Sequence, residues 1–207
     1  MKRLISLIVA SMMIMPVVAQ SDTRIQRQKQ RESQARIKQL TRAGWEVIGG
    51  KETIEDAVQS HFDKLIKGGD DIIEIYGTAN RVKTTDEGIA KATNNAGATY
   101  ARQQSSDLKG RITSNVASAP APSEIEGLIK AYETNLRDGV KSIMTPSYKL
   151  MRTGADGSME VEVYFILSEK AASEVRTRAM ESLIDNNQYA KAHSAAIKEY
   201  VKAGFKN

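Results

Sequence analysis

The chain has 207 residues, 41% hydrophobic and 27% charged, which is long enough for one domain with a substantial buried core. It contains no cysteine, and this excludes disulfides, thiol catalysis, cysteine-bound zinc, iron–sulfur clusters and lipid attachment at an N-terminal cysteine. Its 30 basic and 25 acidic residues give a net charge of +5.

Residues 1–19 have the pattern of a secretory signal peptide. Lys2 and Arg3 precede an apolar run that ends at Ala19, a small residue suited to signal-peptide cleavage. A permanent membrane anchor is the alternative, but the run is short for a bilayer and Pro16 interrupts it. No later apolar run is long enough to span a membrane. We therefore expect an exported bacterial protein, periplasmic or outer-membrane-associated or extracellular, without a transmembrane segment after cleavage.

Residues 20–43 are expected to form a basic helical arm. Between residues 22 and 42 seven basic residues stand against two acidic ones, whereas the remaining mature chain has a net charge of about −2. The basic residues are the candidates for binding a surface: Arg24, Arg27, Lys29, Arg31, Arg36, Lys38 and Arg42.

The arm has few apolar residues, so we expect a solvated helix that projects or frays, docked only by its last turns through Leu40 and Trp45. Two interpretations of its charge remain open. It is either an ordinary solvated face or the attachment to an anionic envelope surface or an unknown envelope protein. If the charge serves for attachment, we expect the arm to be dispensable for folding and required for binding. Nucleic acid is not expected as a partner, because no aromatic residues alternate with the basic ones and the leader exports the chain.

Residues 44–207 are expected to form a single α+β domain. Gly44–Gly50 predicts a short strand or extended link, and an amphipathic helix follows over residues 54–66 with Thr53 as its cap and Gly68-Gly69 as its stop. His61 borders the apolar side of this helix. We interpret it as a satisfied boundary histidine, because His193 is the only other histidine.

A strand from Ile72 and a long helix up to Ala119 form the predicted centre of the domain. The strand places four residues on one face by alternation, and these are Ile73, Ile75, Gly77 and Ala79. On the helix one stripe is small through its first half, and it consists of Ala90, Gly97, Ala101, Leu108, Ile112 and Ala119. Small residues on both elements predict close packing of the helix on the sheet. An ordinary Ala-rich helix is the alternative.

The rest of the chain predicts further helices and one hairpin. Pro120 and Pro122 mark a turn before a helix capped by Ser123 with Glu126. Two alternating strands, PSYKLMRT and MEVEVYFIL, flank a turn at Asp156-Gly157, and the helices after residue 168 end at Gly204. The fold class expected is α+β, with a small antiparallel sheet of about three strands and a short fourth packed against long helices.

No sequence motif for catalysis, a cofactor or a metal occurs. The acidic pairs Asp70-Asp71 and Glu160/Glu162 are interpreted as solvated carboxylates. We therefore predict no catalytic, cofactor-binding or metal-binding residue. Three hypotheses remain: a non-enzymatic envelope protein that binds a partner or surface, a self-associating structural envelope subunit, and a hydrolase with an unrecognised carboxylate or histidine site.

Two short segments carry a resemblance to a known family. Gly44-Trp45-Glu46-Val47 and the strand segment from Ile75 to Ala79 precede an Ala-rich helix, whose alanines include Ala90, Ala92, Ala96 and Ala101. This order resembles exported Bacteroidetes proteins of unknown function, and the Helicobacter surface-lipoprotein antigen domain and the N-terminal domain of the flagellar T protein. The resemblance covers roughly residues 44–170. It implies a small α+β envelope domain without catalysis, and no lipid anchor carries over because the chain lacks the cysteine.

Overall fold

A computed structural model describes residues 18–115, 122–154 and 156–204. Most of the predicted signal peptide therefore lies outside the described residues, as do Ala119, Pro120 and Phe205. The described helices are α1 (Val18–Arg42), α2 (Ile54–Gly68), α3 (Thr85–Asn115), α4 (Pro122–Val140), α5 (Glu169–Ile184), α6 (Gln188–Ala192) and α7 (Ser194–Ala203). The strands are β1 (Glu46–Val47), β2 (Ile72–Val82), β3 (Thr145–Thr153) and β4 (Met159–Ser168), with single 3₁₀ turns at Gly69–Asp71 and Lys141–Ile143.

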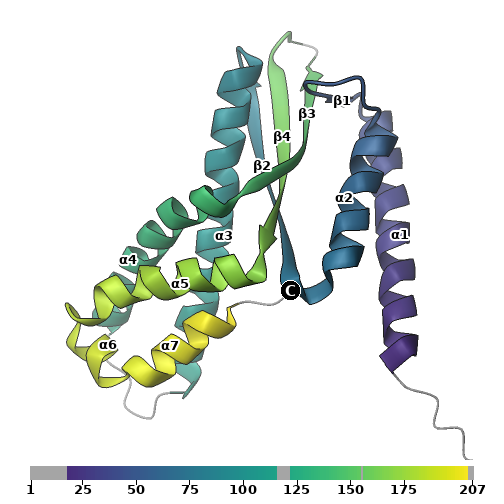
Figure 1. The fold of residues 1–207 in the computed structure, drawn as a ribbon. Helices are drawn as coiled ribbons and strands as arrows, with labels where there is room; N and C mark the ends of the chain where they lie inside the picture. Colours follow the sequence, from purple (N-terminus) through teal and green to yellow (C-terminus); the bar gives the residue numbers. More distant parts are fainter. Residues whose placement is uncertain (1–17, 116–121, 155, 205–207) are drawn as a thin grey trace, which may run out of the picture.

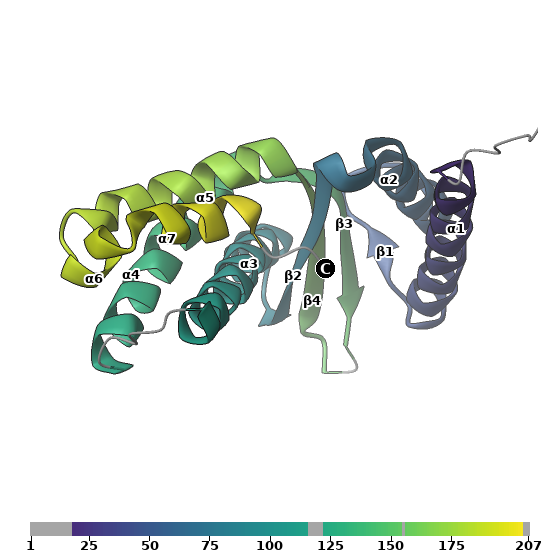
Figure 2. The same ribbon diagram turned by 90° about the horizontal axis from the view of Figure 1, so that it is seen from below.

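The four strands form one antiparallel sheet in the order β1-β3-β4-β2. Helix α3 covers one face of this sheet, and α2 and α1 lie on the other (Figures 1 and 2). The helices from α4 onward pack beside α3 and extend its hydrophobic core away from the sheet. The α+β fold class with a short fourth strand is thus confirmed.

Alternation along β4 divides the two hydrophobic cores. Val161, Val163, Phe165 and Leu167 are buried toward α3, whereas Tyr164 is buried in the cluster beneath α2. The predicted hairpin is present: β3 pairs with β4, and Gly157 takes a φ of 77°, a conformation that favours glycine. The predicted start of α2 is confirmed as well, because Thr53 and Asp56 form a reciprocal capping box.

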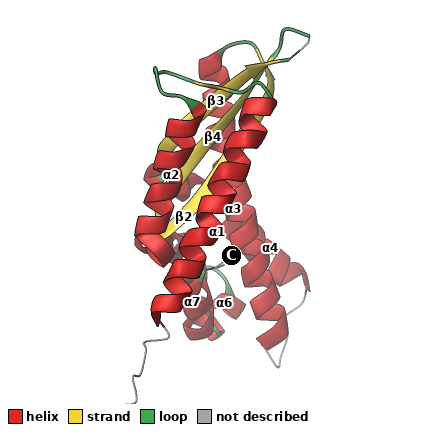
Figure 3. Cartoon of the chain, turned by 90° about the vertical axis from the view of Figure 1, so that its right-hand side faces the viewer, coloured by secondary structure: helices red, strands yellow, loops and turns green. Residues whose placement is uncertain are grey.

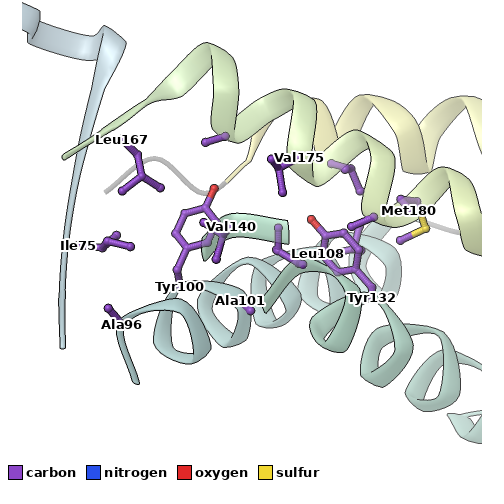
Figure 4. Close-up of a cluster of buried hydrophobic side chains, with 14 of the residues drawn as sticks. Ile75, Ala96, Tyr100, Ala101, Leu108, Tyr132, Val140, Leu167, Val175 and Met180 are labelled. Atoms are coloured by element: carbon purple, nitrogen blue, oxygen red, sulfur yellow. The ribbon is translucent and has the colours of Figure 1, made fainter. Parts of the chain in front are cut away.

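The sheet and α3 approach closely through small residues, as the sequence predicted. A Cβ atom at Gly77 of β2 would collide with the carbonyl oxygen of Ala92 and lie 2.6 Å from the amide nitrogen of Ala96. Ala96 and Ala101 lie on the inner side of α3 in Figure 4, Ala96 close to Ile75 of the strand. Glycine at position 77 is therefore required by the contact between the two backbones.

The predicted stripe on α3 is wrong at its start, because Ala90 is exposed. The reason is that α3 has two successive partners. Its first turns rest on the sheet through Gly88, Ala92 and Ala96, whereas further along it packs on α4, where Gly97 faces the end of that helix. A single line along a 31-residue helix cannot follow both contacts. The predicted cap at Ser123 is also displaced, because α4 already begins at Pro122, a residue suited to a first turn.

Helix α7 is fastened by a buried arginine that the sequence patterns did not predict. Arg176 on α5 is 1% exposed and donates hydrogen bonds to the Tyr100 hydroxyl, the Glu169 carboxylate and the carbonyl oxygens of Val201 and Lys202. All four hydrogen bonds come from the Nε, Nη1 and Nη2 atoms of this one side chain. Arg176 thus ties the last helix to α5 and α3.

The basic arm docks through its last turns, as expected, and its burial begins earlier than those turns, at Ser33. Helix α1 packs against α2 (Figure 3), and in the second half of α1 Ser33 and Leu40 are 1% and 4% exposed. Leu40 belongs to the same hydrophobic cluster as Trp45, as predicted. Among the described residues, no helix has the length and apolarity needed to cross a membrane.

Candidate functional site: the two faces of helix α1

The inner face of α1 is anchored by a cation. The Arg36 guanidinium donates a hydrogen bond of 2.6 Å to Oε1 of Glu74 on β2, and one of 3.4 Å to the hydroxyl of Tyr148 on β3. The guanidinium carbon also lies 4.8 Å from the ring centre of Phe62 and 5.0 Å from that of Tyr164. Arg36 therefore joins α1, α2 and the sheet at one point.

Charge pairing overrides burial at Glu74. Burial alone would raise the pKa of this carboxyl group, but His61 beside it and the charge and hydrogen bond of Arg36 lower the pKa to about 2. His61 Nε2 is 3.5 Å from Glu74 Oε1, whereas the Arg36 contact measures 2.6 Å, so we regard Arg36 as the stronger partner. Burial would lower the pKa of Arg36, but Glu74 raises it instead, and the pair stays ionised.

His61 lies deeper than the sequence indicated. Its side chain is fully buried, and apart from the 3.5 Å approach of Nε2 to Glu74 Oε1, which does not have hydrogen-bond geometry, neither ring nitrogen has a polar partner among the described residues. Its ring instead packs edge-on against Phe62, Tyr148 and Tyr164, with centre distances of 5.1 to 6.2 Å. The interpretation of His61 as a satisfied boundary residue is therefore wrong: it is a core residue held by aromatic rings.

Three tyrosines form a ladder across the sheet beneath these groups. Tyr148 stacks on Tyr164 at 4.4 Å and Tyr164 stacks on Tyr76 at 5.4 Å, in agreement with their cross-strand pairing. Burial raises the pKa values of the Tyr148 and Tyr164 phenols. The ladder ends on the edge strand at Tyr76, and this residue is 55% exposed. The Glu74 carboxylate is thus paired with Arg36, and the His61 imidazole is packed against aromatic rings.

The outer face of α1 carries five exposed basic side chains on one line. On a helical wheel of 100° per residue these five fall within about 60° of arc, on the side of the helix opposite Ser33 and Leu40. We call this set the basic stripe, and it consists of Arg24, Arg27, Arg31, Lys38 and Arg42. At about 1.5 Å per residue it is about 27 Å long.

The structure separates the remaining two candidate cations from the basic stripe. Lys29 is half-buried and lies 3.3 Å from Glu32 on the same helix. Arg36 points to the sheet. No ion pair joins a member of the basic stripe to any carboxylate of the described residues. Five of the seven predicted residues are therefore presented together, and two are not.

The surface of the basic stripe is shallow. An open depression on it is lined by Ala35, Lys38, Gln39, Arg42 and Ala43. On the helical wheel Ala35 lies beside the stripe, and its small side chain leaves the flanking cations accessible. Such a surface can contact a broad anionic partner but encloses no small molecule.

One backbone acceptor of the long edge strand β2 is bonded to a side chain of α3. Helix α3 packs along β2, and the Asn95 side chain donates a hydrogen bond of 2.8 Å to the carbonyl oxygen of Thr78. A further strand pairs through free backbone groups of an edge, and this carbonyl group already accepts a hydrogen bond. Self-association through this edge is therefore disfavoured at Thr78.

A signal for the inner face was present in the sequence. Ser33, Ile37 and Leu40 follow helical spacing, and Arg36 stands next to this line, so a wheel centred on Leu40 would have turned Arg36 inward. Its partners Glu74 and Tyr148 carry no local signal, since they are 38 and 112 residues away. Over the described residues, no group of three or more His, Cys, Asp or Glu is placed to hold a metal ion.

Comparisons with known proteins returned no matching family model, no similar curated protein and no similar solved structure.

Proposed function

We propose that this chain is a non-enzymatic, exported cell-envelope protein that binds an anionic envelope surface or an acidic partner through the basic stripe of α1. The observation that carries the proposal is the separation of charge on α1. Five exposed cations share one line, while the cation that serves the fold, Arg36, is turned to the sheet. The resemblance to exported envelope proteins and the leader of residues 1–19 support the location.

The position of α1 suits this role. It lies outermost on its side of the sheet (Figure 2), and the C-terminal half of its inner face is fixed by Arg36 and Leu40. Lys38 and Arg42 are therefore presented on the packed half of α1, whereas Arg24, Arg27 and Arg31 precede Ser33, its first buried residue.

The proposal is tested on the protein in its own cell. Cell fractionation should find the protein outside the cytoplasm. Mass spectrometry of its N-terminal peptide should show that the mature chain begins at Gln20. A variant with all five stripe residues changed to glutamine should lose salt-sensitive binding to an envelope extract. Intact Met1 in a cytosolic fraction would contradict the location, and unchanged binding of the variant would contradict the stripe.

The binding protein proposed here and a hydrolase predict different results for substitutions at Glu74 and His61. A hydrolase built on Glu74 or His61 requires substrate access to those groups, whereas we propose that they hold the fold. Loss of a hydrolytic activity in Glu74→Gln while the protein remains folded would favour the hydrolase.

A further inference from the structure

The shape of the stripe narrows the class of partner. Helix α1 forms the outer flank of the molecule, and in Figures 1 and 2 no other helix or strand of the described chain lies beyond it. The five cations follow a straight line of about 27 Å along a convex surface. A flat partner can meet all five at once without contacting the rest of the domain.

The chemistry of the stripe favours charge without insertion. Membrane-inserting helices carry several large apolar side chains on the face opposite their cations. On α1, Ile25 is the one exposed large apolar side chain among the described residues, and a single such residue does not form an apolar face. In the second half of α1 the face opposite the stripe is already buried in the fold at Ser33 and Leu40, and α1 packs against α2.

The charge of the whole molecule orients it. The segment of residues 22–42 has a net charge of +5, whereas the rest of the chain after residue 19 has a net charge of about −2. An anionic plane attracts α1 and repels the remainder, so the stripe faces the plane before contact is made.

We infer that the basic stripe binds the phosphate headgroups of an anionic lipid surface side-on, by charge alone and without inserting into the bilayer. This inference rests on the proposed function and specifies the partner of the same site. A lipid plane offers many phosphates on one flat surface, which matches five cations in line. Each basic residue near such a surface adds a roughly equal share of affinity.

The test is sedimentation with vesicles of phosphatidylglycerol in phosphatidylcholine, and with phosphatidylcholine alone. The protein is used as the chain from Gln20, because the apolar leader would bind vesicles by itself. The wild-type chain should bind only the anionic vesicles and should dissociate as salt rises. Arg31→Gln with Lys38→Gln should weaken binding about 30-fold.

Two matched variants separate lipid binding from a general effect of charge and from binding to a protein. Lys130→Gln with Lys198→Gln removes the same charge from exposed positions on α4 and α7 and should leave binding unchanged. Arginine changed to lysine at the four stripe arginines should also retain binding, because a headgroup plane responds to charge, whereas a protein site built for paired hydrogen bonds to arginine would be weakened.

Equal weakening by the control on α4 and α7 would overturn the inference, and so would failure of the wild type to bind anionic vesicles. Stripe-dependent binding to an envelope extract or to immobilised polyglutamate, without binding to vesicles, would assign the stripe to an acidic protein. That result would refute lipid binding and leave the proposed function standing.

Discussion

The guanidinium of Arg36 and the carboxylate of Glu74, 38 positions apart in sequence, are joined by a hydrogen bond of 2.6 Å between α1 and the edge strand β2. Both side chains are about three-quarters buried, so the pair is partly desolvated. This contact decides how α1 should be understood. One of its seven cations holds the helix to the domain, and five others are free for a partner.

Removal of one partner of this pair should destabilise the fold. Arg36→Gln is expected to lower the free energy of unfolding by about 2–4 kcal/mol, because Glu74 would remain buried without its cation. Chemical denaturation of Arg36→Gln, Glu74→Gln and the double variant measures the coupling. The double variant should lose less than the sum of the single losses, and simple additivity would show that the pair is not coupled.

Stability should fall in acid through Glu74. Its pKa is about 2 in the folded protein and near 4.5 in the unfolded chain, so the unfolded chain binds the proton first as pH falls. The contribution, at most about 3 kcal/mol, is complete above pH 5 and is lost as the pH falls toward 2. The stability difference between wild type and Glu74→Gln should therefore shrink over this range. A constant difference would mean that Glu74 has an ordinary pKa.

The close approach of α3 to the sheet can be tested with one methyl group. Gly77→Ala should destabilise by about 1–3 kcal/mol or more, because the new Cβ would collide with the backbone of α3 at Ala92. Gly110→Ala is the control on α3, since its Cβ would enter open space. It should stabilise by up to about 1 kcal/mol through helix propensity. Equal effects of the two substitutions would refute the contact.

The last helix should depend on Arg176. Arg176→Met would remove the donor to Tyr100, Glu169 and the Val201 carbonyl oxygen, and we expect a loss of about 3–5 kcal/mol. The Lys202 carbonyl oxygen would keep its hydrogen bond from the Ser173 hydroxyl. Hydrogen exchange should rise first in α7. Arg178→Met, on an exposed position of the same helix, should change little. Unchanged protection of α7 in Arg176→Met would contradict this role.

Local patterns in the sequence predicted most of the fold. Thr53, Asp156-Gly157 and the alternation of Val161 to Leu167 act over a few residues, and each appears as expected. Contacts between distant segments were not predictable in the same way. Nothing near Arg36 distinguishes it from Arg31 except its position on the helical wheel, and that position matters only once α2 is known to cover Leu40.

Arg176 shows the same limit in a helix with a well-predicted apolar face. It lies next to Val175 in sequence and is buried because the backbone carbonyls at the end of α7 and the Tyr100 hydroxyl accept its protons. Those acceptors come together only in the folded chain. Burial of an arginine therefore depended on tertiary partners rather than on periodicity.

The central claim, that α1 has one face for the fold and another for binding, is tested most directly by comparing Arg36→Gln with Arg31→Gln. Both substitutions remove one positive charge from the same helix, so a general effect of charge is equal in the two. For each variant the unfolding free energy and the salt-dependent binding to an envelope extract are measured. We predict that Arg36→Gln loses stability and, below its unfolding transition, keeps its binding. Arg31→Gln should keep its stability and bind about fivefold more weakly. Equal losses of binding in the two variants, or a loss of stability in Arg31→Gln, would contradict the account.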